Sequence, residues 1–79
     1  MGISGREWLV EYASNLGTAA PSDDELDELL ALAGIAAHAS ERTAAPVACW
    51  LAAKAGRSTG EALAIAKRTA EALAEDGPA

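Results

Sequence analysis

Ser22-Asp23-Asp24-Glu25, followed by apolar residues at helical spacing, decides the fold of this 79-residue chain. The pattern is a capping box: the serine oxygen accepts a hydrogen bond from the amide three residues on, and the glutamate accepts one from the serine amide. The same Ser-x-x-Glu pattern recurs at Ser4-Gly5-Arg6-Glu7 and at Ser58-Thr59-Gly60-Glu61. Each copy precedes a periodic apolar stretch, so the sequence predicts three helix starts.

Stop signals complete the helical pattern. Gly17 and Gly56 follow the first and third periodic stretches and suit the left-handed position after a helix. Proline is tolerated in the first turn of a helix, so Pro46 fits a further helix that begins just before it. Thr43 is the predicted N-cap of that helix. We therefore predict an all-α fold, a compact four-helix domain with short connections and helices over about 5–16, 23–41, 44–55 and 59–75. The whole chain, 1–79, is expected to be a single helical domain.

The predicted centre of this domain follows from the apolar side chains. Of the 51% of residues that are hydrophobic, 21 residues are alanines, so larger apolar groups are few. They concentrate on the second helix, which is apolar over more than half its circumference, and on the third, through Val47, Trp50 and Leu51. We expect these two helices to form the centre.

Charge and cysteine content limit the possible partners and compartments. Twelve acidic residues against six basic ones give a net charge of −6, which argues against nucleic-acid partners and anionic membranes. Cys49 is the single cysteine, so no intrachain disulfide forms. With no signal-peptide pattern and no apolar stretch long enough to span a bilayer, we expect a soluble, cytoplasmic protein.

The sequence shows no catalytic motif, and we expect no catalytic residue, metal or cofactor. The acidic cluster at 23–28 is open to two interpretations: metal ligands or a docking patch, or stabilisation of the positive end of the second helix. It lacks the glycine turn of a calcium loop, which favours the second. A nucleophilic pair of Cys49 and His38 is conceivable, but nothing supplies the third, orienting group.

His38, Arg42 and Pro46 are the candidate site residues. His38 and Arg42 are four positions apart, so we expect both side chains on one face near the end of the second helix. These cations can complement the negative helix C-terminus. Alternatively, they flank free amides that start at Ala44, ahead of Pro46, where an anion could bind.

Trp8, Tyr12 and Trp50 are the only aromatic residues. Their helical spacing within apolar stripes favours positions in the core. An exposed one would instead be an anchor for an interface, because tryptophan is common in binding hot spots.

The stretch 30–47, Leu-Ala-Leu-Ala-Gly-Ile-Ala-Ala-His-Ala-Ser-Glu-Arg-Thr-Ala-Ala-Pro-Val, resembles a small actinobacterial helical family of unknown function. His38, Arg42 and residues 44–46 carry the resemblance, whereas Thr43 replaces an expected proline. The similarity extends over about residues 8–74, where the first helix opens with Trp-Leu and the last is alanine-rich. Members of that family occur alone, or fused or adjacent to molybdopterin-guanine dinucleotide biosynthesis proteins of the nucleotidyltransferase type.

The resemblance implies a non-catalytic helical accessory module linked to molybdenum-cofactor biosynthesis or delivery. Its expected partner is a nucleotidyltransferase-type enzyme or the molybdoenzyme machinery. One alternative is a domain that binds a small anion or nucleotide at the turn of His38, Arg42 and Pro46. Another is a helical protein that associates with itself.

Overall fold

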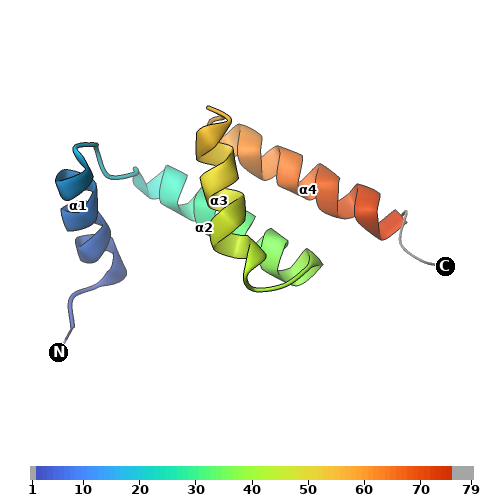
Figure 1. The fold of residues 1–79 in the computed structure, drawn as a ribbon, viewed down its shortest axis with the longest axis horizontal. Coiled ribbons are helices and arrows are strands. Elements are labelled where there is room, and N and C mark those ends of the chain that lie inside the picture. The colour runs from blue at the N-terminus through green and yellow to red at the C-terminus, as the bar shows by residue number, and fades with distance from the viewer. Residues whose placement is uncertain (1, 76–79) are drawn as a thin grey trace.

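The computed structural model describes residues 2–75 and confirms the all-α, four-helix prediction. The helices are α1 (Gly5–Leu16), α2 (Asp23–Ala39), α3 (Ala44–Lys54) and α4 (Thr59–Glu75) (Figure 1). Their starts coincide with the predicted starts. The main difference in extent is that α2 ends two residues earlier than expected.

All three capping boxes form. In the first, Ser4 Oγ accepts from the Glu7 amide and the Ser4 amide donates to Glu7 Oε1, both at 3.0 Å. The boxes at Ser22 and Ser58 have the same two bonds, with lengths between 2.9 and 3.1 Å. Gly17 and Gly56 adopt φ values of 82° and 73°, the left-handed conformation that their stop signals predicted.

The C-terminal end of α2 is set by Ser40. Its amide donates to the Ala36 carbonyl oxygen at 3.2 Å, and its hydroxyl donates to the same oxygen at 2.7 Å. Its backbone then leaves the helical region, with φ −143° and ψ −101°. A short polar side chain that bonds to its own backbone competes with helix continuation, so α2 ends at Ala39 instead of near 41.

Thr43 occupies the N-cap position of α3, but its side chain makes no capping hydrogen bond, contrary to the role expected of it. Its backbone is already helical, with φ −64° and ψ −21°, whereas a capping side chain needs an extended backbone. The preceding turn supplies acceptors in its place. The Ala44 and Ala45 amides donate to the carbonyl oxygens of Glu41 and Arg42 at 3.0 and 3.1 Å.

The central helix is α2, which packs against both α3 and α4. Helices α2 and α4 run in the same direction, and α3 runs from the C-terminal end of α2 back to the start of α4 (Figure 1). Thr59 Oγ1 donates to Glu28 Oε1 at 2.6 Å and ties the starts of α4 and α2 together.

The prediction that α3 shares the centre is wrong. Among its residues none is buried, and Val47, Trp50 and Leu51 are each more than half exposed. Helix α3 is apolar on nearly all sides, but it packs mainly against one neighbour, α2. The rest of its apolar surface therefore stays exposed.

Helix α1 stands apart from the other three, beyond the N-terminal end of α2 (Figure 1). An ion pair between Arg6 and Asp23, both solvent-accessible, spans the connection. Within residues 2–75, three residues are buried: Ala13, Leu32 and Ala62. So thin a core leaves apolar surface open on both parts of the molecule.

Candidate functional site

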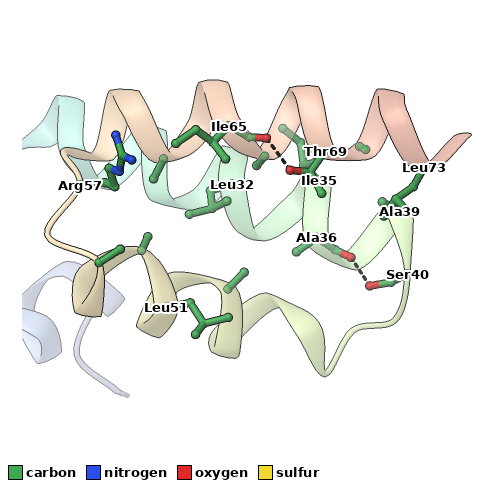
Figure 2. Close-up of a pocket in the computed structure, with 16 residues that line it drawn as sticks. Leu32, Ile35, Ala36, Ala39, Ser40, Leu51, Arg57, Ile65, Thr69 and Leu73 are labelled. Atoms are coloured by element: carbon green, nitrogen blue, oxygen red, sulfur yellow. Dashed lines mark hydrogen bonds between the residues drawn. The ribbon is translucent and has the colours of Figure 1, made fainter. Parts of the chain in front are cut away.

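An apolar groove of about 450 Å³ runs between α3 and α4, with α2 as its floor. Figure 2 shows the side chains of the three helices pointing into it from opposite sides. Three of its sixteen lining residues are polar, namely Ser40, Arg57 and Thr69. The apolar lining residues are Leu32, Ile35, Ala36, Ala39, Ala48, Leu51, Ala52, Ala55, Ala62, Ile65, Ala66, Ala70 and Leu73.

The groove follows from where the sequence places large and small apolar residues. On α2 and α4 the lining positions recur every three or four residues, the spacing of one helix face. Large side chains stand at Leu32, Ile35, Leu51, Ile65 and Leu73, and most other lining positions are alanine. Alanine lets helices approach each other but does not fill the space above their contact, so a hollow remains.

The polar lining side chains offer little to a polar ligand. The Ser40 hydroxyl donates to the Ala36 carbonyl oxygen, and the Thr69 hydroxyl donates to the Ile65 carbonyl oxygen at 2.8 Å (Figure 2). Both hydroxyl protons are therefore used within their own helices. Arg57, at the end of the groove near the start of α4, is the one charged lining residue. An apolar surface with one cation at its end suits an apolar helix better than a polar metabolite.

The predicted site residues lie outside this groove. His38, Arg42 and Pro46 are all exposed, and among the described residues no hydrogen bond or ion pair joins them. His38 borders a second, shallower hollow between α2 and α4, together with Gly34 and Ala70. Because α2 ends at Ala39, Arg42 lies in the following turn and does not share a helix face with His38.

The amides invoked for anion binding already have partners. The Ala44 and Ala45 amides donate to backbone carbonyl oxygens of the turn, and Pro46 has no amide proton. Anion binding at this turn would therefore depend on the His38 and Arg42 side chains.

Cys49 faces the backbone of α2. Its sulfur lies 3.9 Å from the Leu29 carbonyl oxygen, and burial raises the pKa of its thiol. Within the described residues, no hydrogen bond links Cys49 to His38, and the raised pKa disfavours the thiolate that a nucleophile requires.

The acidic residues at the start of α2 have separate tasks. Glu25 completes the capping box and Glu28 accepts the hydrogen bond from Thr59. Over residues 2–75, no group of three or more His, Cys, Asp and Glu side chains is arranged to hold a metal ion. The same residues include no helix with the length and apolarity needed to cross a bilayer.

The aromatic residues depart from the core positions that were favoured for them. Trp8 and Tyr12 stack with ring centroids 5.0 Å apart, yet are 53% and 48% exposed. Trp50 is 59% exposed and has Lys54 Nζ 4.9 Å from its ring centroid. Because their side chains are about half exposed or more, the three residues are candidate interface anchors, which is the role expected of an exposed aromatic residue.

Comparison with known families identifies the family of the chain. A family model described as Domain of unknown function (DUF6457) matches residues 4–79. The chain belongs to the DUF6457 family. No curated protein and no solved structure matches it. The DUF6457 match covers the stretch 30–47, on which the resemblance to a helical family of unknown function was based.

Residue patterns missed the groove as a site. Leu51 and Arg57 were not singled out for binding, although Ala48, Leu51 and Ala52 share one face of α3 at helical spacing and Ala55 follows at its C-cap. The available signal was that α2 is apolar on more faces than one neighbouring helix can cover.

Proposed function

We propose that this DUF6457 protein is a non-catalytic helical interaction module, and that its groove binds an apolar helix of a protein partner. The observation that carries the proposal is the groove itself: thirteen of sixteen lining residues are apolar, and the three polar ones are exposed residues. An amphipathic helix that lays its apolar face into such a groove would complete the four-helix arrangement that α2, α3 and α4 begin.

The energetics favour such a partner. Each large apolar side chain moved from water into the groove contributes about 1.5–3 kcal/mol. Three anchors on one helix face therefore supply about 4.5–9 kcal/mol, which offsets much of the roughly 4–15 kcal/mol cost of association, and burial of the groove side chains adds to this gain. A polar ligand would lose hydrogen bonds to water and find few replacements in the groove.

We further propose that the partner acts in molybdenum-cofactor guanylylation or delivery in the cytoplasm, as a nucleotidyltransferase-type enzyme or part of the molybdoenzyme machinery. This step rests on the family resemblance carried by His38, Arg42 and Pro46. Under this proposal these exposed residues form a polar contact beside the α2–α3 turn, and the groove supplies the apolar contact.

Two exposed leucines test the groove. Leu51 lines it and is 53% exposed, whereas Leu30, on α2, is 62% exposed and does not line it. Leu51→Glu should weaken binding to a molybdopterin-guanine dinucleotide nucleotidyltransferase from the same organism at least tenfold in calorimetric titration, while Leu30→Glu should leave it within twofold. Circular dichroism checks that both variants stay helical. Equal effects of the two substitutions would contradict the groove as the binding surface.

The turn is tested separately. His38→Ala combined with Arg42→Ala should leave helicity intact and abolish copurification with the nucleotidyltransferase. Unchanged copurification would remove His38 and Arg42 from the binding surface, without affecting the comparison of Leu51 with Leu30.

A further inference from the structure

Within residues 2–75, the amphipathic helix α1 makes no extensive contact with another helix. Trp8, Tyr12 and Leu16 are spaced four residues apart and form one stripe, and their exposed fractions are 53%, 48% and 61%. The Trp8 and Tyr12 rings stack on each other along this stripe. Three large apolar side chains left in water on one helix face are a cost that burial elsewhere would recover.

The groove matches α1 in length. With 1.5 Å of rise per residue, the twelve residues of α1 extend over roughly 18 Å. On α4, the lining from Ala62 to Leu73 extends over roughly 16 Å by the same rise. The groove is thus open over about the length of α1, and it lacks the fourth helix that a bundle would place between α3 and α4.

We infer that the groove binds α1 of a second copy of this chain, in a reciprocal dimer that exchanges α1 helices. Within one chain, Gly17 in the left-handed conformation ends α1, and Ser22 caps the start of α2. The Arg6–Asp23 ion pair lies across the connection between the two helices. This arrangement holds α1 beyond the N-terminal end of α2, away from its own groove (Figure 1). A second copy presents the same stripe without that constraint, and a two-fold axis satisfies both grooves at once.

The buried area is sufficient for a dimer. If each stripe residue buries about 100 Å², roughly half of what a large aromatic side chain can bury, one α1 contributes about 300 Å² and the groove about as much. Two reciprocal contacts then bury about 1,200 Å², the lower end of the range for specific interfaces.

Charge also fits. Arg57 is the cation at the end of the groove, and Glu11 lies beside the stripe, three residues after Trp8 and next to Tyr12. A docked α1 can bring an acidic side chain to the one charged position of the groove. This inference rests on the proposed function only in using the same groove, and it names a different occupant, so α1 of a second copy and a partner helix compete for the groove.

Sedimentation of the full chain tests the exchange. At roughly 0.1–1 mM, where even a weak dimer forms, the wild-type chain should sediment at twice its monomer mass. The monomer mass is 8.0 kDa. Trp8→Ala with Tyr12→Ala should shift the chain to the monomer, and so should Leu51→Glu. The matched control is Val10→Ala, because Val10 is as exposed as Tyr12, at 48%, but lies off the stripe. Circular dichroism verifies that each variant keeps its helices.

Three outcomes overturn the inference, and each leaves a different result for the proposed function. A wild-type monomer overturns it and leaves the groove free for a foreign partner. A dimer that depends on Leu51 but not on Trp8 and Tyr12 shows that another segment fills the groove. A dimer unaffected by Leu51→Glu excludes the groove from self-association, and the calorimetric comparison of Leu51 with Leu30 then decides whether the groove binds a foreign partner.

Discussion

At the scale of single residues, Leu32 carries more of the core than any other side chain. It is 4% exposed, and the other two buried residues, Ala13 and Ala62, each have only a methyl side chain. The stability of a chain of this length is about 4–12 kcal/mol, so one buried leucine is a large share of it.

Leu32→Ala should therefore lower the free energy of unfolding by about 2–5 kcal/mol, through lost burial and the cavity left behind. Leu30→Ala is the matched control, because Leu30 is 62% exposed on the same helix and its truncation should change stability by no more than about 0.5 kcal/mol. Urea unfolding followed by circular dichroism measures both. Similar losses for the two variants would show that the packing around α2 is misassigned.

Single residues also explain why the candidate site was only partly predictable. The resemblance singled out His38 and Arg42, but Ser40, between them, ends α2 through its bond to Ala36. That bond breaks the helical spacing on which a shared face depended. Whether a serine hydroxyl caps its own helix depends on the backbone that follows, and a pattern of residue types does not specify it.

At the scale of elements, the capping boxes are local enough to be predicted. Every partner lies within three residues, so Ser4, Ser22 and Ser58 behave alike whatever the rest of the chain does. Helix position is different, because it depends on which elements meet. The apolar residues of α3 predicted burial, yet α2 alone takes the central place, because it packs against both α3 and α4.

The box at the start of α4 predicts a dependence on pH. The Ser58 amide donates to the Glu61 carboxylate, and this bond, followed by the bond to the Ser58 side chain, lowers the pKa of Glu61 from its usual 4.5. A lowered folded-state pKa means that the contribution to stability is present above pH 4.5 and is lost as the pH falls through the folded-state pKa.

Accordingly, the amide resonance of Ser58 should titrate with a midpoint below pH 4.5 in the wild-type chain. In Glu61→Gln the same resonance should not follow that titration, since glutamine can accept the bond at every pH. Amide NMR spectra over the acidic range measure both. A wild-type midpoint at or above 4.5 would contradict the hydrogen-bonded role of Glu61.

At the scale of the whole molecule, two unfilled apolar surfaces lie on separate parts of one chain. The groove lies on the unit formed by α2, α3 and α4, and the aromatic stripe lies on α1. The groove was not predictable as a site from local patterns, because it is formed by helices α3 and α4, which pack on α2 rather than on each other. The aromatic residues of the stripe were named from the sequence as interface anchors only in case they are exposed, and their exposure depends on which elements meet. With little buried core of its own, a chain this small gains from covering such surfaces with another molecule.

The most direct measurement of the central claim, that the groove binds α1 of a second copy of the chain, uses a mixture of methyl-labelled and unlabelled chains. Isotope-filtered NMR should show contacts from the labelled methyl groups of Leu51, Ile65 and Leu73 to the Trp8 and Tyr12 ring protons of unlabelled chains. The Val47 methyl groups, more than half exposed and outside the groove, should show none. Intermolecular contacts at Val47 but not at the groove, or no intermolecular contact at concentrations where the chain is dimeric, would contradict the claim.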